Sequence, residues 1–511
     1  EEQNTEEKEE EKRALEFGEK YSKLAKIPLV NKVTKWIYKE GWVYVAIFIL
    51  ILLIAFSLRI HNIQNVYFGD DEFGSIYSSE SFAKTGTFLL PSGESYLRAP
   101  IHLIAMSIMI NIFGIMNPFS TRLISIIASI FSLIIIYFIS RHFFDKKISL
   151  SIVCFLTFSA WEIAWAREAR MYALFQTFYL FVVLILIKYK FNKKIILILG
   201  ILLTIFSHEM GIIVLIPVIF VYFYLFIIKV GYLIKTRHLI ILGGLLAIII
   251  ILIITTFNLF PGMISIAKEV FGFIPKYFYL NFLINNYFLF FLFGSLISLC
   301  FIYSILIKKQ KSINKVILLT FVIIPLIIIS LFLNWQQSKY IFFIFPIFIT
   351  LGCYGLHKML LILKFNKIYF LILLMALTPF TNTYDIVASN SINKENFDYS
   401  YGSMVHPDYS ILENINKNNS TIISTNIWSA EYYVGRNDYL LRDVGTLLKN
   451  IYYTKDGRNY EIYTGSEIVS DLDSLKNILE INRKTYLIAD YRFYGYNILE
   501  VIQFIEKRFT V

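Results

Sequence analysis

Residues 42–58 read WVYVAIFILILLIAFSL, an unbroken apolar run that decides the class of this protein. A helix over such a run is long enough to cross the ~30 Å hydrocarbon core of a bilayer. Runs 239–256 and 316–333 have the same character. With 57% hydrophobic and only 17% charged residues, the 511-residue chain is too apolar for a soluble protein. The sequence therefore predicts a polytopic membrane protein.

Three adjacent carboxylates follow this first run closely, in the sequence Gly69-Asp70-Asp71-Glu72-Phe73. Such a cluster beside a membrane span is either a solvated turn or an active site at the bilayer surface. Residues 72–84 have the pattern of a short surface helix, with Asp70 or Asp71 as its N-cap and Gly86 just after its end.

Loop charge predicts the topology. Residues 101–113 are apolar but short for a span, which favours an interfacial or re-entrant helix. If they do not cross, the second span covers roughly 119–140 and the basic loops that follow all lie in the cytoplasm; if they cross, all of these loops lie outside. The loops are residues 141–147, 188–194, 229–238, 308–315 and 358–367. The first arrangement gives about eleven spans, with the N-terminus inside and the C-terminus and the carboxylates outside.

The end of the chain has a different composition. From about residue 381 it is polar and rich in Asn and Tyr, with strand patterns at 421–424 and 485–489 and helix patterns at 472–481 and 497–508. These patterns predict a small extracytoplasmic α/β domain. The expected parts are a cytoplasmic tail and amphipathic segment at 1–40, a transmembrane catalytic module at 41–380 with its first outer loop at 60–118, and the α/β domain at 381–511.

Charge and cysteine content exclude several classes. The net charge of +11 comes mostly from the loops between spans, which indicates topology and no nucleic-acid partner. The three cysteines lie in apolar runs, without the spacing of a zinc site or a disulfide framework. A lysine-rich segment that Pro28 divides follows the charged N-terminal tail. This segment is predicted to form two short amphipathic helices on the inner leaflet, or alternatively a flexible basic linker.

Several cations lie on the predicted outer face, against the usual bias of basic residues toward the cytoplasm. Arg167 and Arg170 are three positions apart at the start of a predicted helix, which would place them on one face. The alternative for any one cation is pairing with Glu162 or Glu168, or contact with lipid headgroups. Several cations together with three carboxylates favour a binding site. The outer group comprises Arg98, Arg167, Arg170, Lys276 and Lys339, with His208 and Glu209 in another outer loop.

Carboxylates and cations at one membrane surface fit the transfer of a sugar from a lipid phosphate. The leaving phosphate needs cations, and the acceptor needs one general base. Within the same fold, a ligase or polymerase that uses a lipid-diphosphate glycan is the alternative. A different class, a transporter or flippase of lipid-linked sugars, would place its ionisable residues near mid-span, often in inverted repeats. The charges here lie at span ends and in loops.

With these residues in view, the sequence resembles the GT-C glycosyltransferases of the protein O-mannosyltransferase and aminoarabinose-transferase type. The resemblance covers roughly residues 40–380 as an order of short motifs. In chain order these are Asp71-Glu72, then Gly86, Pro91, Gly93, Tyr96, Arg98 and Pro100, then Arg122-Leu123, the run Arg167 to Tyr172, and Lys339-Tyr340 with Pro346.

This resemblance implies an all-α membrane module with juxtamembrane helices in the first outer loop. It also implies an inverting transferase that takes its sugar from a polyprenyl phosphate, with Asp71 as the catalytic base. The family does not settle whether Asp70 is the base instead, and we expect Asp70 and Glu72 to shape the site or assist. The implied donor phosphate-binding residues are Arg98, Arg167, Arg170, Lys339 and Tyr340. Candidate substrate-binding residues are Tyr96, Tyr172, His208, Glu209 and Lys276.

Two features of these families are not carried over. Leu97-Arg98-Ala99-Pro100 replaces the Glu-Lys-Pro-Pro-like run of the aminoarabinose transferases, so neither their metal site nor lipid A as acceptor follows. The chain also lacks the His-Pro-Pro run and the large luminal domain of the protein mannosyltransferases, so a protein acceptor does not follow. The sequence requires no cofactor and leaves a divalent metal open. Expected partners are a polyprenyl-phosphate sugar, an acceptor lipid, glycan or protein, and the lipids of the plasma membrane in the cell envelope.

Overall fold

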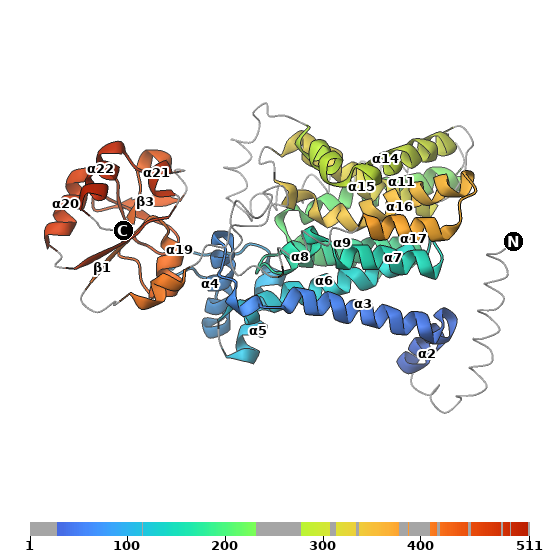
Figure 1. The fold of residues 1–511 in the computed structure, drawn as a ribbon, viewed down its shortest axis with the longest axis horizontal. Coiled ribbons are helices and arrows are strands. Elements are labelled where there is room, and N and C mark those ends of the chain that lie inside the picture. The colour runs from blue at the N-terminus through green and yellow to red at the C-terminus, as the bar shows by residue number, and fades with distance from the viewer. Residues whose placement is uncertain are drawn as a thin grey trace.

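The structure is a computed structural model in which a helical bundle adjoins a C-terminal region that contains a sheet (Figure 1). The run 239–256, Lys276 and the part of the N-terminal segment before Pro28 lie outside the described residues. The structure describes residues 28–114, 116–230, 277–306, 313–333, 337–377, 387, 409–415, 420–447, 451–481, 484–490 and 492–508.

The bundle is built from membrane-spanning helices. Seven of the described helices are long and apolar enough to cross a membrane, and α7 (Lys146–Thr157) with α8 (Ala160–Ala166), which meet at 60°, give an eighth if counted together. The spans contain α3 (Trp42–Ile60), α6 (Pro118–Ser140), α9 (Tyr172–Tyr189), α11 (Leu215–Val230), α14 (Phe278–Leu306), α15 (Ile313–Phe332) and α16 (Phe345–Ile362). The chain is thus a mostly helical polytopic membrane protein, and the count of about eleven spans, which includes 239–256, stays a prediction.

Shorter helices complete this part of the chain. They are α2 (Pro28–Glu40), α10 (Lys194–Ser207) and α17 (Lys367–Ala376). Proline suits the first turn of a helix because its missing N–H has no partner there, and α2 accordingly begins at Pro28. The second of the two predicted N-terminal helices is therefore present.

Helices α14 and α16 approach each other very closely. A Cβ atom at Gly355 of α16 would lie 2.1 Å from the carbonyl oxygen of Phe293, and one at Gly352 would lie 2.7 Å from that of Phe290. Small residues permit such backbone contact between membrane helices. A 3-10 helix, Ser338–Ile344, leads directly into α16, so this packing also fixes the segment that precedes α16.

The first loop contains the two short helices expected from the sequence, α4 (Asp70–Thr85) and α5 (Pro100–Phe113). Gly86 ends α4 in the left-handed region at φ 77°, as predicted. The prediction that Asp70 or Asp71 caps α4 is wrong, because the N-cap is Gly69 and both aspartates lie within the first turn. The Glu72 carboxylate accepts a 2.7 Å hydrogen bond from the Gly69 N–H and so closes the helix start.

The C-terminal region is a mixed six-stranded sheet flanked by helices. Its strands run in the order β3-β4-β5-β2-β1-β6, in which β5, β2, β1 and β6 are parallel and β3–β4–β5 are antiparallel. Ile422 and Ile423 of β1 belong to separate apolar clusters, as alternation along a strand covered on both faces requires. The strands are β1 (Thr421–Ser424), β2 (Tyr439–Leu441), β3 (Tyr452–Lys455), β4 (Arg458–Glu461), β5 (Glu467–Val469) and β6 (Thr485–Ile488).

The helices of this region match the predicted pattern. Helix α20 (Leu472–Ile481) has the predicted bounds, and α22 (Leu499–Arg508) begins two positions later than predicted. The other helical segments are α19 (Ile427–Ser429), a π-helical turn (Ala430–Val434) and α21 (Arg492–Tyr496). The predicted α/β character of the C-terminal region is therefore confirmed.

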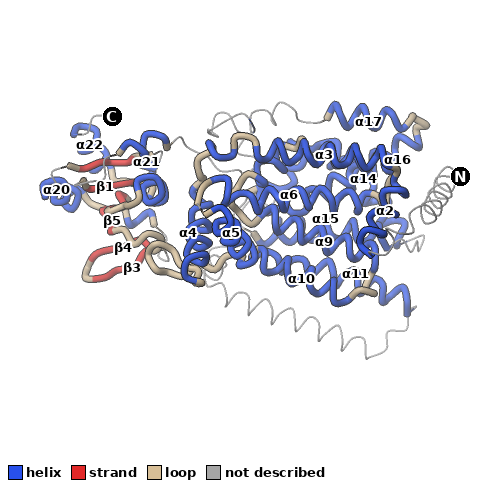
Figure 2. The backbone as a smooth tube through the Cα atoms, turned by 90° about the horizontal axis from the view of Figure 1, so that it is seen from below, coloured by secondary structure: helices blue, strands red, loops and turns tan. Residues whose placement is uncertain are grey.

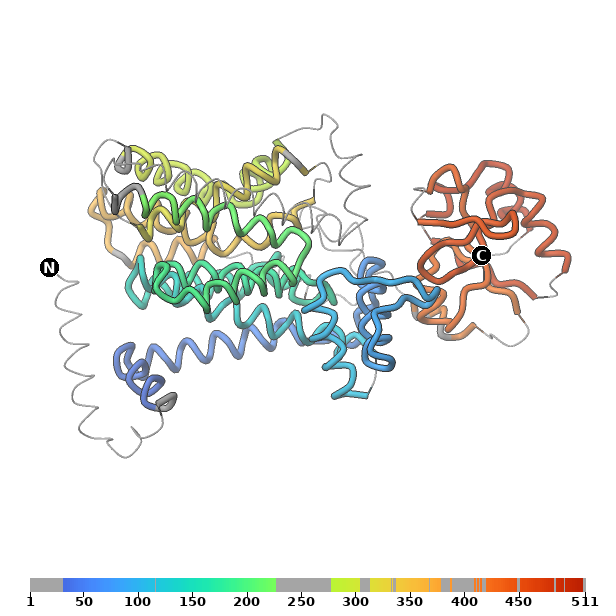
Figure 3. Tube along the Cα trace, turned by 180° about the vertical axis from the view of Figure 1, so that it is seen from behind, coloured from blue at the N-terminus to red at the C-terminus, as the bar shows by residue number. Residues whose placement is uncertain are grey.

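The C-terminal region contacts the end of the bundle that carries α4 and α5, whereas α2 lies at the opposite end (Figures 2 and 3). Phe73 of α4 stacks on Trp428, with ring centroids 6.0 Å apart. The backbone N–H of Phe68 donates to the hydroxyl of Tyr433 at 3.1 Å, and that of Ser92 donates to the Tyr463 carbonyl at 3.1 Å. The first loop is thus enclosed between the bundle and the sheet.

Candidate active site

Asp71 is the carboxylate of the acidic cluster that faces open space. It lies in the first turn of α4 with its side chain 46% exposed. The ammonium of Lys339, from the 3-10 helix that precedes α16, approaches its Oδ2 at 3.3 Å. Lys339 also lies 6.0 Å from the ring centre of Tyr172 and 5.6 Å from that of Tyr340. The fold therefore brings together a carboxylate and a cation that are 268 positions apart in the chain.

Arg170 fixes the backbone beneath Asp71. Its guanidinium is buried and donates to the Asp71 carbonyl oxygen at 2.5 Å, to Ser75 Oγ at 3.3 Å and to the Tyr96 hydroxyl at 3.5 Å. The Tyr96 ring packs on Gly74, where a Cβ atom would lie 3.0 Å from it. Arg170 thus holds the first turn of α4 while adding positive charge near its carboxylate.

These cations set the charge state of Asp71. Partial burial raises the pKa of its carboxyl group, but Lys339, Arg170 and Arg98 outweigh burial and hold the pKa below the ordinary value of 3.8. Asp71 is therefore ionised at neutral pH and able to accept a proton or a hydrogen bond.

Glu72, the next residue, is in a closed environment. Its carboxylate is fully buried and forms a two-bond ion pair with Arg122 of α6, at 2.8 and 2.7 Å, and accepts a 2.6 Å bond from the Ala169 N–H. Arg122 also donates to the carbonyls of Val66 and Tyr67 at 2.8 and 2.9 Å. Glu72 therefore binds the first loop to α6 and has no open path to a substrate.

Asp70 faces the C-terminal region. Its Oδ1 accepts a 2.9 Å hydrogen bond from the side-chain amide of Asn426, and its Oδ2 pairs with Arg492. Asp70 thus connects α4 with the segments that follow β1 and β6. The two adjacent aspartates have different surroundings, and only Asp71 has Lys339 beside it.

A second ion pair borders the Asp71 cluster. Arg98, 44% exposed, binds both carboxylate oxygens of Glu209, one of them at 2.9 Å. His208 is buried, accepts the Met210 N–H on Nδ1 at 2.9 Å, and lies with its ring centre 5.1 Å from that of Tyr172. The predicted residues of this loop therefore approach the Lys339 side of the cluster.

Arg167 and Arg170 do not share a helix face, so that prediction is wrong. The chain leaves helix between α8 and α9, and the two side chains have separate partners. Arg167 is buried and donates to the carbonyls of Leu58 and His61, at 3.3 and 2.7 Å, near the end of α3. Its contacts are those of a structural cation that terminates α3, whereas Arg170 contacts α4.

Several residues of this arrangement carried little signal in the sequence. Arg122 is a charged residue within an apolar span, a feature that usually has a specific partner, but its partner Glu72 could not be read from spacing. Asn426 is the N-cap of α19 and Arg492 is the first residue of α21, and neither position gave a motif. Ser75 is one of several serines on α4.

The residues around Asp71 do not suit a divalent metal ion. Its charged neighbours Lys339, Arg170 and Arg98 are cations, which repel such an ion, and Asp70 and Glu72 are engaged elsewhere. Within the described ranges, no group of three or more His, Cys, Asp or Glu side chains is arranged to hold a metal.

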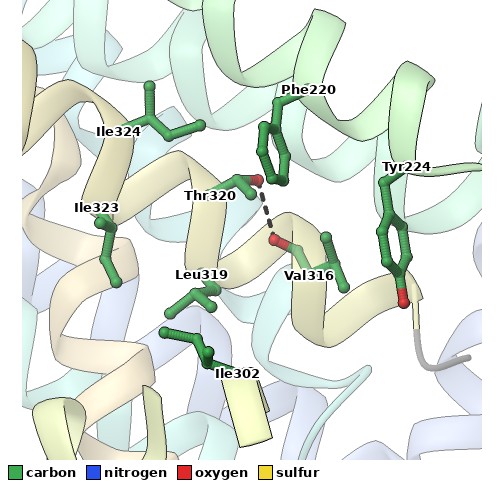
Figure 4. Close-up of a pocket in the computed structure, with 8 residues that line it drawn as sticks. All are labelled: Phe220, Tyr224, Ile302, Val316, Leu319, Thr320, Ile323 and Ile324. Atoms are coloured by element: carbon green, nitrogen blue, oxygen red, sulfur yellow. Dashed lines mark hydrogen bonds between the residues drawn. The ribbon is translucent and has the colours of Figure 1, made fainter. Parts of the chain in front are cut away.

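An apolar cavity of about 250 Å³ lies between α11, α14 and α15 and opens to the surface beside the exposed Phe220 and Ile302 (Figure 4). Thr320 on its wall donates its hydroxyl to the Val316 carbonyl at 2.9 Å. The other lining residues are Phe220, Tyr224, Ile302, Leu319, Ile323 and Ile324. None of these described lining residues is charged, so the cavity suits a hydrocarbon chain and not the chemistry of the Asp71 cluster.

Comparison with known proteins agrees with this architecture. Residues 98–255 match the family described as dolichyl-phosphate-mannose-protein mannosyltransferase, a range that includes Arg98, Arg122 and Arg170 but begins after Asp71. No curated protein matches the chain significantly.

Solved structures share the fold at low sequence identity. An archaeal oligosaccharyltransferase, AglB from Archaeoglobus fulgidus in complex with an inhibitory peptide and a dolichol phosphate, is 14% identical with a TM-score of 0.51; the match covers 78% of this chain and 63% of AglB. ArnT from Cupriavidus metallidurans, bound to undecaprenyl phosphate, is 10% identical with a TM-score of 0.51, over 78% of this chain and 86% of ArnT. The predicted resemblance of the chain to GT-C membrane glycosyltransferases of the mannosyltransferase and aminoarabinose-transferase type is thereby confirmed.

Proposed function

We propose that this protein is an inverting glycosyltransferase that moves a sugar from a polyprenyl phosphate to an acceptor at the outer face of the membrane. The observation that carries the proposal is the exposed Asp71 carboxylate beside Lys339, at the end of a membrane bundle with the GT-C fold. The family match supports an enzyme, and the lipid phosphates bound by AglB and ArnT support the donor class.

In this proposal Asp71 is the general base. Its carboxylate takes the proton of the acceptor O–H or N–H while the acceptor atom forms a bond to the anomeric carbon of the sugar. The bond from that carbon to the phosphate oxygen breaks at the same time, and the polyprenyl phosphate leaves with the electron pair. Attack opposite the leaving group inverts the anomeric centre. Asp71 is preferred to Asp70 because Asn426 and Arg492 already engage the latter.

The cations beside Asp71 receive the leaving phosphate. Lys339, which is largely buried beside Asp71, and the half-exposed Arg98 are the positive charges that stabilise the negative charge growing on the phosphate. Arg170 contributes charge and holds the backbone of Asp71. Tyr96, Tyr172 and Tyr340 form aromatic walls, while Glu209 orients Arg98 and His208 supports Tyr172.

The proposed topology has about eleven spans, a cytoplasmic N-terminus and an extracytoplasmic C-terminal domain at the plasma membrane. The basic loops between spans support it, as does the position of α2 at the end of the bundle away from α4 (Figure 1). The proposed parts remain 1–40, 41–380 and 381–511. The acceptor is a lipid, a glycan or a protein.

The direct test is sugar transfer by the purified protein in nanodiscs, with polyprenyl-phosphate sugars and diphosphate-linked glycans offered as separate donors. We expect transfer from the monophosphate donors. Asp71→Asn, which hardly changes side-chain size, should lower transfer by roughly 10²–10⁴-fold without changing the melting temperature. Full activity in Asp71→Asn would remove this residue as the base.

Two other results would replace the proposal. Transfer only from diphosphate-linked donors would identify a ligase or polymerase. Movement of labelled lipid-linked sugar across proteoliposome membranes, without a new glycosidic bond, would identify a transporter.

A further inference from the structure

A cavity of about 260 Å³ lies where the C-terminal sheet meets the start of α4. Asp70 forms part of its wall, and the remaining described lining comes from the C-terminal region. A volume of this size is slightly below the usual range of small-molecule sites, so it suits a single ring-sized group. The cavity is thus next to the turn that carries Asp71.

The cavity occupies the position in the sheet where parallel folds commonly bind ligands. Thr425 follows β1, Arg442 follows β2 and Arg492 follows β6, so all three come from the carboxyl ends of neighbouring parallel strands. The chain places β2 on one side of β1 and β6 on the other, which makes this edge a topological switch point. The sheet therefore presents a preformed crevice toward α4.

Aromatic rings form much of the lining. Trp428 and Tyr463 lie with ring centroids 5.1 Å apart, and Arg442 lies over the ring of Tyr496 at 4.0 Å. Such rings pack against the apolar C–H face of a sugar, while planar polar side chains bind its hydroxyl groups. Thr425 and Arg442 supply polar groups beside the rings.

The charges of the lining balance one another. Arg492 pairs with Asp70, and Glu461 accepts the backbone N–H groups of Tyr463 and Thr464, each at 2.6 Å. With Arg442 as the second cation, the two positive and two negative side chains among the described lining residues sum to zero. This balance favours a neutral ligand over a phosphate or a carboxylate.

We propose that this cavity binds a neutral sugar unit of the acceptor and thereby holds the acceptor beside Asp71. The inference rests on the proposed glycosyltransferase function and names the class of its acceptor, a neutral saccharide. Asp70 connects the two places, because it lines the cavity and precedes Asp71 in the first turn of α4. The proposed function leaves a lipid, a glycan or a protein as the acceptor. A neutral saccharide corresponds to the glycan.

Saturation-transfer NMR on the full chain in nanodiscs tests the proposal. The probes are glucose, galactose, mannose and N-acetylglucosamine, with glucuronate and inorganic phosphate as anionic comparisons. At least one neutral sugar should bind saturably to the wild-type protein and to Asp71→Asn. Arg442→Leu and Tyr496→Leu should each weaken that binding about tenfold or more. Tyr496→Phe keeps the ring and should bind nearly as the wild type does.

The matched control is Arg458→Leu, which removes an exposed arginine of the same sheet that does not line the cavity. The proposal is overturned if no neutral sugar binds, if an anionic probe binds more tightly, or if Arg458→Leu weakens binding as much as Arg442→Leu. Melting temperatures of the variants distinguish lost contacts from lost folding. Sugar binding without any transfer would refute the enzyme assignment alone, and transfer without sugar binding would refute the cavity assignment alone.

Discussion

Asp71 and Glu72 are neighbours in one helical turn, yet they occupy opposite kinds of surroundings. Glu72 is fully buried and its oxygens are held by Arg122 and the Ala169 N–H. Asp71 is 46% exposed, with Lys339 at 3.3 Å. The difference teaches that charge alone does not mark a reactive group. A buried carboxylate that is held by an arginine and a backbone N–H organises the loop, whereas an exposed one beside a cation is accessible to a substrate.

The largest effect on stability should come from Glu72→Gln. It leaves Arg122 as an uncompensated buried charge, which typically costs about 3–5 kcal/mol. We expect a markedly lower melting temperature in detergent, whereas Asp71→Asn should melt like the wild type. The control is Glu80→Gln on the same helix, whose pair with Lys84 is largely exposed and worth about 0.3–0.5 kcal/mol. If the Glu72 and Glu80 variants have the same melting temperature, Glu72 has no special structural role and its contrast with Asp71 fails.

Lys339→Met should lower transfer at neutral pH on the order of a hundredfold, because one preorganised charge at the leaving phosphate is lost. It should also change the pH profile. Lys339 lowers the pKa of Asp71, so its removal raises that pKa and moves the acid limb of kcat/KM to higher pH. If the acid limb of kcat/KM stays at the same pH in Lys339→Met, Lys339 does not influence the pKa of Asp71.

A smaller effect is expected for Asp70→Asn. This change removes the charge that pairs with Arg492 but keeps a group able to contact Asn426, so transfer should fall by less than about tenfold. Measured beside Asp71→Asn, it ranks the two aspartates. A loss larger than that of Asp71→Asn would make Asp70 the base and exchange their roles.

Local sequence signals predicted the helices of the first loop well. Gly86 and Pro100 mark an end and a start that follow from backbone geometry, and the 101–113 run was too short to span. The N-cap was missed because Glu72 reaches back to the Gly69 N–H, so the first turn begins earlier than the aspartates suggest.

The same local signals could not predict contacts between residues that are far apart in the chain. Arg167 and Arg170 look equivalent in the sequence, but the break between α8 and α9 sends one to the end of α3 and the other to α4. The contacts of Asp70 with Asn426 and Arg492 join segments more than 350 positions apart. Such contacts depend on how the helical bundle and the C-terminal region pack against each other. The local spacing of apolar residues does not contain that information.

The ion pair between Arg122 and Glu72 has one further consequence. Arg122 lies on α6, whose apolar length fixes its height in the bilayer, so the pair holds the start of α4 at a set height above the hydrocarbon. A donor anchored by a polyprenyl chain has its phosphate near that same plane. In the proposed reaction, encounter is then a two-dimensional search within the membrane, governed by the density of donor per lipid rather than by its concentration in bulk solution.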